Sequence, residues 1–241
     1  KAKARLVYDK VLNKTLVAKH LIKRDILSKG FSPELVREEL SVLERLPKHE
    51  NVCAYYRHFE TRNSVFFIVE DCGDDNLQAM IDRRKDWFSD KAIGNQQFAR
   101  NITKQILAGQ LALKQAGMYH QDLAAVNVMV KRGMRVKLID FGSARFDNKR
   151  DKDYATPMKE YHSLEMVRET PTTPAETDVW CDGVLIFQCV YLDFPFGERT
   201  DLPTLFFRIK SLDYSLKREM PRDLSHLLSK IFVPAHKRLT I

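Results

Sequence analysis

The sequence of 241 residues is poor in glycine and cysteine and contains no long hydrophobic run. Its longest apolar stretch, 184–192, includes Gln188 and is far shorter than the roughly 20 residues that cross a bilayer. No glycine precedes Gly30, so the N-terminal segment lacks a glycine-rich loop that would let backbone amides approach a phosphate. The cysteines have no C-x-x-C spacing, which argues against a zinc site: Cys53, Cys72, Cys181 and Cys189.

A net charge of +8 and a hydrophobic content of 44% describe a basic chain with enough apolar residues for one sizeable core or two lobes. No dense basic block with interleaved aromatic residues is present, so we expect a solvated basic surface and no nucleic-acid partner. We expect Cys181 and Cys189, in an apolar segment, to be buried as hydrophobic residues. The chain starts within a structural pattern and is interpreted as an excised domain.

Two motifs organise the middle of the chain. His120, Asp122 and Asn127 form H-x-D-x-x-x-x-N, and residues 140–142 form D-F-G. Between them, 126–130 and 136–139 read as two short strands joined by a turn at 131–133. Either motif alone is weak evidence, but together they resemble the catalytic and metal-binding loops of eukaryotic protein kinases.

The resemblance implies roles for these residues and the cofactors ATP and Mg²⁺. Asp122 would orient the attacking hydroxyl and accept its proton. Asn127 and Asp140 would supply the hard oxygen ligands that Mg²⁺ prefers. The reaction needs little more than positioned metal ions, a carboxylate at the hydroxyl and neutralised phosphate charge.

The N-terminal part supports the same resemblance. Segments 4–8 and 15–20 read as strands, and Leu16-Val17-Ala18-Lys19 resembles the kinase strand that carries the phosphate-pairing lysine, here Lys19. Its alanine is displaced by one position from the family pattern. A helix is predicted to begin at Ser32-Pro33 and to run to about Leu46. By its register Glu39 would pair with Lys19, and Glu38 is the alternative.

A second strand pair, 53–59 and 64–70, leads into a segment that resembles the hinge between kinase lobes. Val69 would be the gatekeeper, and backbone groups of Glu70 and Cys72 would hold the adenine. Val17 would also contact the cofactor. Helices are then predicted over 76–84 and 95–116.

Motifs near the C-terminus extend the resemblance over nearly the whole chain. Residues 146–156 resemble an activation segment, and 161–165 resemble the motif that closes it. Residues 178–184 resemble the buried central helix of the family. Arg238 would form a buried ion pair with Glu165.

The predicted fold class is therefore α+β: a bilobal protein kinase fold with a small β-rich N-lobe, one αC-type helix and a larger, mainly helical C-lobe. We assign residues 1–71 to the N-lobe, with its first strand and glycine loop absent or divergent. Residues 72–241 form the C-lobe, with a truncated C-terminal end.

Three departures from the family pattern qualify the function. The missing glycine loop was either cut off or is truly absent, and true absence resembles the with-no-Gly-loop (WNG) kinases and pseudokinases that apicomplexan parasites secrete into their vacuole. Gln121 replaces the arginine that receives an activation-segment phosphate, so control through that contact is not expected. Ala124 stands where serine/threonine kinases carry lysine, which resembles tyrosine kinases or indicates slow catalysis.

Two functions remain open at this stage. The first is an atypical kinase that transfers phosphate from Mg-ATP to protein Ser/Thr hydroxyls, and the neighbouring sequence favours Ser/Thr over Tyr. The second is a pseudokinase that serves as a binding scaffold. A small-molecule phosphotransferase is less favoured, because the motifs resemble apparatus for protein substrates. The substrate, oligomeric state and compartment are not determined by these residues.

Overall fold

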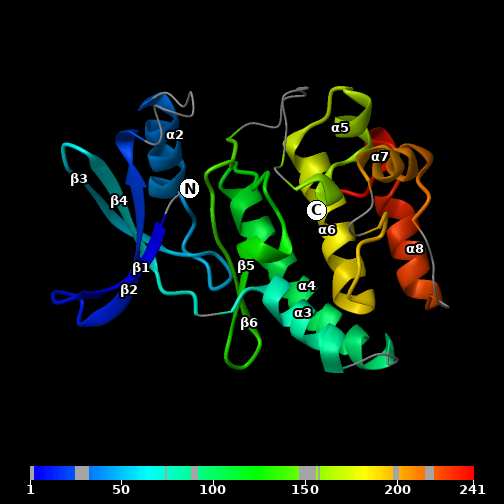
Figure 1. Cartoon of the computed structure of the whole chain (residues 1–241), viewed down its shortest axis with the longest axis horizontal. Helices are drawn as coiled ribbons and strands as arrows, with labels where there is room; N and C mark the ends of the chain where they lie inside the picture. The colour runs from blue at the N-terminus through cyan, green and yellow to red at the C-terminus, as the bar shows by residue number, and fades with distance from the viewer. Residues whose placement is uncertain are drawn as a thin grey trace.

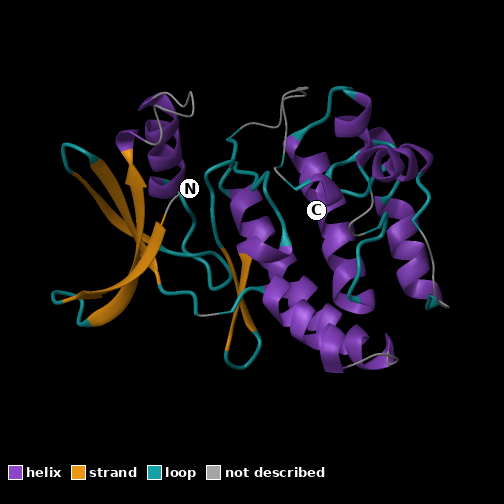
Figure 2. Cartoon of the chain, in the orientation of Figure 1, coloured by secondary structure: helices purple, strands orange, loops and turns teal. Residues whose placement is uncertain are grey.

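The computed structural model describes residues 3–24, 33–73, 75–87, 92–146, 156, 158–197, 201–214 and 220–241. A small antiparallel sheet with one helix beside it lies at one end, and a larger helical part lies at the other (Figures 1 and 2). The predicted bilobal α+β architecture is confirmed.

The sheet contains four antiparallel strands in the order β1-β2-β4-β3. Their bounds are β1 Lys3–Asp9, β2 Lys14–Ile22, β3 Tyr55–Glu60 and β4 Ser64–Glu70. Strand β3 begins two residues later than predicted, and Cys53 lies in the preceding loop, where its backbone N–H bonds to Leu138.

Alternation along β2 decides which of its side chains reach the cleft. Leu16 and Ala18 are buried on one face of the sheet together with Ile68. Val17 and Lys19 project from the other face, because successive side chains of a strand point to opposite sides. The sequence order Leu-Val-Ala-Lys thus places the lysine on the side of the helical part.

Helix α2, Pro33–Glu44, lies beside the sheet (Figure 1). It buries Val42 and Leu43 against the core. It ends two residues before the predicted end at Leu46, and Pro47 follows soon after. The predicted N-cap, Ser32, lies outside the described residues.

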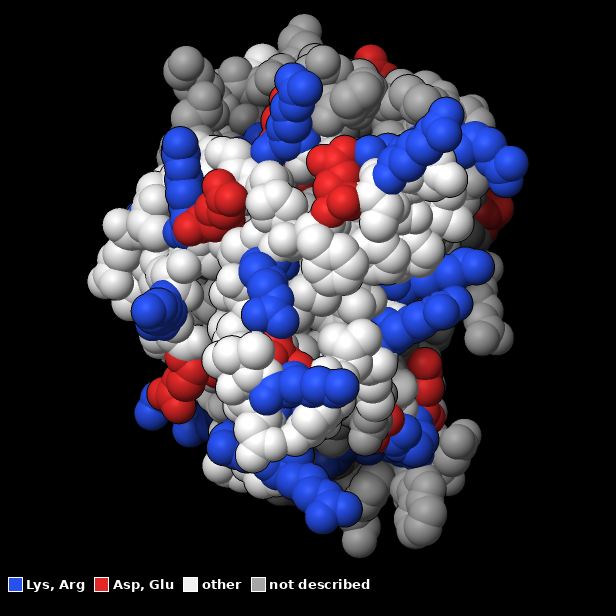
Figure 3. Space-filling view, turned by 90° about the vertical axis from the view of Figure 1, so that its left-hand side faces the viewer, with Lys and Arg blue, Asp and Glu red and all other residues white. Residues whose placement is uncertain are grey.

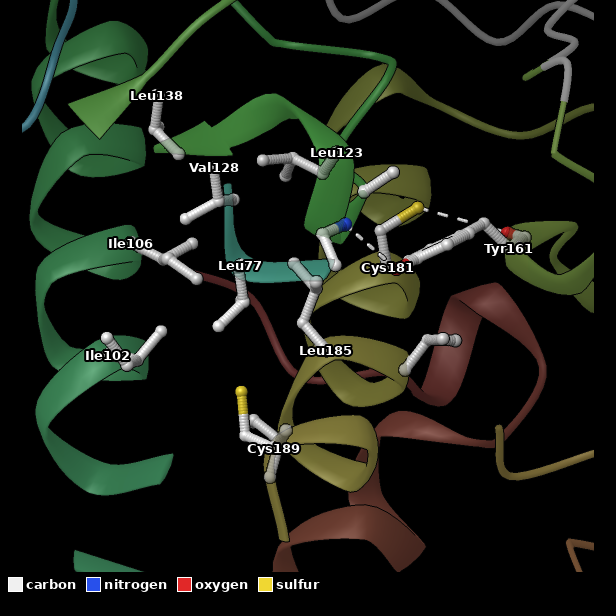
Figure 4. Packing of buried hydrophobic residues seen from close by; sticks show 14 of the residues in the cluster. Leu77, Ile102, Ile106, Leu123, Val128, Leu138, Tyr161, Cys181, Leu185 and Cys189 are labelled. Carbon is white, nitrogen blue, oxygen red and sulfur yellow. Dashed lines mark hydrogen bonds between the residues drawn. The ribbon is translucent and has the colours of Figure 1, made fainter. Parts of the chain in front are cut away.

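The helical part is built around α6, Pro174–Tyr191, of which 15 residues are buried. Thr173 and Glu176 form a capping box at its start. In Figure 4, Leu185 and Cys189 of α6 face Ile102 and Ile106 of the long helix that spans Ala92–Gln115, and Leu77 lies between them. The other helices are α3 Leu77–Trp87, α4 Ala92–Gln115, α5 Leu164–Arg168, α7 Leu202–Ser211 and α8 Arg222–Ile231.

Close packing of α6 explains Gly183. A Cβ there would lie 2.6 Å from Ile231 and 2.9 Å from Phe232, so any side chain would displace α8 and the residue after it. Cys181 and Cys189 of α6 are 2% and 0% exposed, as predicted. The buried ion pair is also present, with Arg238 Nη2 2.8 Å from Glu165 Oε2.

A hairpin of β5, Val128–Lys131, and β6, Arg135–Leu138, lies between the sheet and the helices (Figure 1). The prediction that its first strand begins at Val126 is wrong, because 125–127 form a 3₁₀ turn. This tight turn aims Asn127 back toward Asp122. The hairpin reverses at Gly133 and Met134, both with positive φ.

On the face that carries the sheet, Lys and Arg side chains are spread among uncharged and acidic ones rather than gathered into one block (Figure 3). Within the described part of the chain, no helix combines the length and the apolar character that a bilayer crossing requires.

Candidate active site

Lys19 lies where β2, α2 and the loop after β6 meet. Its Nζ donates to Glu39 Oε1 at 2.6 Å and to Asp140 Oδ1 at 2.7 Å. Burial lowers the pKa of Lys19, but the two carboxylates raise it by more, so its pKa lies above the ordinary value. Burial likewise raises the pKa of Asp140, yet the charge of Lys19 outweighs this and keeps that pKa low. Lys19 and Asp140 are therefore charged at neutral pH.

The structure decides which acidic residue faces Lys19. Glu39 points toward the sheet, and its side chain is 11% exposed, whereas Glu38 lies on the solvent side of α2. Consecutive helical residues are separated by about 100°, so only one of the two can reach the strand.

Asp122 is held by hydrogen bonds to both of its carboxylate oxygens. Asn127 Nδ2 donates to Asp122 Oδ2 at 2.9 Å and to the Asp122 carbonyl at 2.8 Å. Thr156 Oγ1 donates to Asp122 Oδ1 at 2.9 Å. Asn127 keeps its side-chain oxygen without a hydrogen-bond partner among the described residues, so that oxygen can serve as a ligand.

Asp178 of α6 fixes the backbone of the two residues that precede Asp122. Its carboxylate accepts the backbone N–H groups of His120, at 2.8 Å, and Gln121, at 2.9 Å. Burial raises the pKa of Asp178 to about 7. Gln121 has a positive φ of 64°, an unfavourable conformation that these bonds stabilise. The loop is therefore positioned by α6, a helix that is buried along most of its length.

The side chains of these two residues, His120 and Gln121, are buried as well. His120 is fully buried, and its Nε2 donates to the Ile139 carbonyl at 3.0 Å. Burial lowers the pKa of His120, so the ring is neutral with its proton on Nε2. Gln121 Nε2 donates to the Pro174 carbonyl at 2.8 Å. The residue that replaces the usual arginine is thus buried against α6.

A cavity of about 340 Å³ lies beside Lys19 between the sheet and the hairpin. This volume falls in the range of about 300–1,000 Å³ that small-molecule sites occupy. Its walls are mostly apolar, and they include three residues predicted to contact the cofactor: Val17, Val69 and Cys72. Met129 and Ile139 line the opposite side.

Glu70 also borders the cavity, but its carboxylate is engaged elsewhere. It forms ion pairs with Lys137 at 2.6 Å and Lys131 at 3.4 Å, and accepts the Ala54 N–H at 3.2 Å. The Glu70 N–H also donates to the Ala54 carbonyl at 2.8 Å, so its backbone carbonyl is the group left for the predicted hinge role.

Sequence reasoning missed Thr156, Met129 and Ile139. Met129 and Ile139 follow from strand alternation in the hairpin, which shows which side chains face the cleft. No local pattern marks Thr156, because its contact with Asp122 spans 34 positions of sequence. Most of the predicted activation segment, 146–156, lies outside the described residues.

The chain is similar to the serine/threonine-protein kinase PKH2 of Candida albicans, with 27% identity over 95% of this chain and 24% of that protein. It is 25% identical to CBL-interacting protein kinase 28 of Oryza sativa over 91% of this chain and 49% of that protein. The serine/threonine-protein kinase PLK4 of Xenopus tropicalis is 26% identical over 89% of this chain and 22% of that protein. The chain thus spans half or less of the length of these curated relatives.

The family comparison covers more of the chain than any of these relatives. The profile described as "Protein kinase domain" matches residues 1–241, which include the lysine, both loops and the buried helix. The chain therefore belongs to the protein kinase domain family.

Proposed function

We propose that this protein transfers the γ-phosphate of Mg-ATP to a Ser or Thr hydroxyl of a protein substrate. The observation that carries the proposal is the Lys19–Glu39–Asp140 cluster on the wall of one cavity. The Ile139 N–H, beside Asp140 in the chain, joins it to the loop of Asp122 and Asn127 by donating to the Asn127 carbonyl at 3.0 Å. These groups come from four separate segments of the chain.

The residues present fit a magnesium nucleotide. Mg²⁺ usually takes one or two protein oxygens together with phosphate oxygens. Asp140 offers a charged carboxylate, and Asn127 offers an amide oxygen that no described residue engages. Mg-ATP, when bound, supplies the transferable phosphoryl group and screens its charge. Val17, Val69 and Cys72 would surround the base, and the ammonium of Lys19 would face the phosphates.

The chain's own contribution to the chemistry centres on Asp122. Its carboxylate is fixed in one orientation by Thr156 and Asn127, so a hydroxyl placed against it meets an aligned proton acceptor. Such a positioned base contributes about 10²- to 10⁴-fold to proton-transfer reactions. Neither Ala124 nor Val126 provides a cation beside this carboxylate, which favours slow turnover.

The substrate class follows from the family and its relatives. PKH2 and PLK4 are both named serine/threonine-protein kinases. Together with the sequence around 141–144 and 161–165, this supports Ser/Thr hydroxyls over Tyr.

We also propose that the two lobes are residues 1–71 and 72–241. Gly73, just beyond β4, has a φ of +96°, a conformation that suits a chain crossing between lobes. The Glu70 ion pairs with Lys131 and Lys137 would tie the crossing to the hairpin of the second lobe.

The alternative is a pseudokinase, and the buried Gln121 and the small Ala124 favour it. The finer assignment to the WNG kinases, with secretion into a parasite vacuole, stays a prediction that the relatives named above do not support. The glycine loop of a kinase would precede β1, so the residues upstream of Lys3 bear on this point.

Mg-ATP binding, measured by calorimetry, tests the proposed function without requiring a substrate. We expect metal-dependent binding that Asp140→Asn weakens by at least about tenfold, because the substitution removes one charged metal ligand. Asp223→Asn, an exposed acid of α8, is the matched control and should bind like the wild type.

Absence of binding by the folded wild-type protein would contradict the enzymatic proposal and favour the scaffold. Binding that is unchanged by Asp140→Asn would show that the metal is held elsewhere.

A further inference from the structure

His162 is a buried histidine within the 161–165 motif, and no role has been given to it so far. It follows Tyr161 just before α5, and it is 8% exposed. Its ring stacks on Phe206 of α7, with centroids 6.0 Å apart and an interplanar angle of 15°. Its Nε2 lies 3.0 Å from the carbonyl oxygen of Thr156.

That carbonyl belongs to the residue whose hydroxyl contacts Asp122. Thr156 is 3% exposed, and its Oγ1 donates to Asp122 Oδ1 at 2.9 Å. The backbone of Thr156 is thus held from one side while its side chain reaches the proposed base from the other. His162 and Asp122 are linked through a single residue.

Tyr161 contacts the same loop by a separate route. Its hydroxyl accepts the backbone N–H of Ala125 at 2.9 Å and donates to Gln188 of α6. Two consecutive residues therefore fix the two sides of the contact between Thr156 and Asp122. Tyr161 fixes the loop that carries Asp122, and His162 fixes the backbone of Thr156.

The ionic state of His162 suits a fixed donor. Burial lowers the pKa of His162, so the ring is neutral at physiological pH. A carbonyl only accepts, so the single proton must lie on Nε2. A histidine kept only for packing would be replaceable by phenylalanine, which preserves the stacking on Phe206 and loses only the N–H.

We propose that His162 is a positioning residue that fixes the backbone of Thr156 and, through it, the orientation of the Asp122 carboxylate. The proposal rests on the proposed phosphotransfer, in which Asp122 accepts the proton. His162 itself touches neither the nucleotide cavity nor the carboxylate.

Two substitutions separate the donor from the ring. His162→Phe keeps an aromatic ring against Phe206 and removes the donor, whereas His162→Gln restores an N–H near the position of Nε2. We expect His162→Phe to lower kcat for basal Mg-ATP hydrolysis by about 10- to 100-fold with little change in KM, because small misplacements of reacting groups cost this much. His162→Gln should recover most of the loss.

A double-mutant cycle with Thr156→Val tests the route of action. If His162 acts through Thr156, then His162→Phe should have almost no further effect on kcat once the Thr156 hydroxyl is removed. Additive losses, or a His162→Phe protein with wild-type kcat, would overturn the proposal.

A structural measurement keeps the test independent of the proposed function. In crystals of His162→Phe, the Thr156 hydroxyl should leave Asp122, and in His162→Gln it should remain. If the hydroxyl stays on Asp122 in His162→Phe, the proposal fails even when the wild type hydrolyses Mg-ATP. If the wild type shows no hydrolysis while the hydroxyl moves as expected, only the proposed phosphotransfer fails.

Discussion

Individual residues of the site depend on which atoms remain free after the local hydrogen bonds are made. Asn127 uses its amide N–H₂ on Asp122 and leaves its oxygen available. Glu70 uses its carboxylate on Lys131 and Lys137 and its N–H on the Ala54 carbonyl, which leaves its backbone carbonyl. Asp122 has both oxygens hydrogen-bonded, yet each retains a further lone pair for a hydroxyl. The same residue types would have other roles if these partners changed.

Asp122→Asn should separate chemistry from binding. The substitution replaces one acceptor oxygen by an N–H₂ group, which cannot take a proton and which opposes either Asn127 or Thr156. We expect phosphate transfer or basal hydrolysis to fall by about 10²- to 10⁴-fold. Mg-ATP affinity, measured by calorimetry, should stay within about twofold, because Asp122 does not line the cavity.

The Asp223→Asn variant again serves as the control for the loss of one carboxylate. Full activity in Asp122→Asn would refute the assignment of Asp122 as the proton acceptor.

Among the elements, α6 connects the segments that build the site. Asp178 near its start holds the backbone of 120–121, and Gln188 near its end accepts the Tyr161 hydroxyl. The carbonyl of Glu176 accepts Arg238 Nη1, which joins the C-terminal segment to the same helix. Because α6 is buried along most of its length, the loops that bond to it are held in fixed positions.

Arg238→Met should destabilise the protein strongly. The Arg238 side chain is fully buried, and its loss leaves the Glu165 carboxylate, itself 7% exposed, without its charge partner. Removing one partner of a buried pair typically costs about 3–5 kcal/mol. Urea unfolding followed by circular dichroism measures this cost.

Two further variants control the measurement. Arg222→Met, at the exposed start of α8, should change the free energy of unfolding by less than about 0.5 kcal/mol. Combining Arg238→Met with Glu165→Gln should cost less than the two single losses added together, since no unpaired charge remains. A loss below about 1 kcal/mol for Arg238→Met would contradict a structural role for the pair.

For the whole molecule, acids whose pKa values are shifted by folding make stability depend on pH. Burial raises the pKa of Asp178 from 3.8 to about 7, so the folded state retains this proton at pH values where the unfolded chain has released it. Its contribution to stability is therefore lost as the pH rises from about 4 to about 7. Asp140 acts in the opposite sense, because Lys19 lowers its pKa and acid removes that stabilisation.

Asp178→Asn isolates the first effect. The unfolding free energy of the wild type relative to this variant should fall by about 1.4 kcal/mol per pH unit between about pH 4 and about pH 7, and then level off. Denaturant unfolding at several pH values measures the slope. A difference that does not vary with pH would mean that Asp178 is ionised in the folded protein throughout this range.

Much of the site is visible in the sequence because its chemistry is carried by short, ordered motifs. The loop spacing fixes Asp122 relative to Asn127, since a tight turn returns the amide to the carboxylate. Strand alternation fixes Lys19 on the side opposite Ala18. The sequence could not show whether Glu38 or Glu39 pairs with Lys19, because this depends on the rotation of α2 about its axis relative to β2.

The sequence by itself determined the family, the fold class and the residues able to do the chemistry, because these depend on local spacing and periodicity. Only the tertiary structure decided that the Gln121 side chain packs against α6 and that two lysines pair with the Glu70 carboxylate. It also decided that His162 is linked to Asp122 through Thr156. Apart from the contact between His162 and Thr156, which are six positions apart, these contacts join residues far apart in the chain. Their geometry follows from how whole elements pack, which no local pattern encodes.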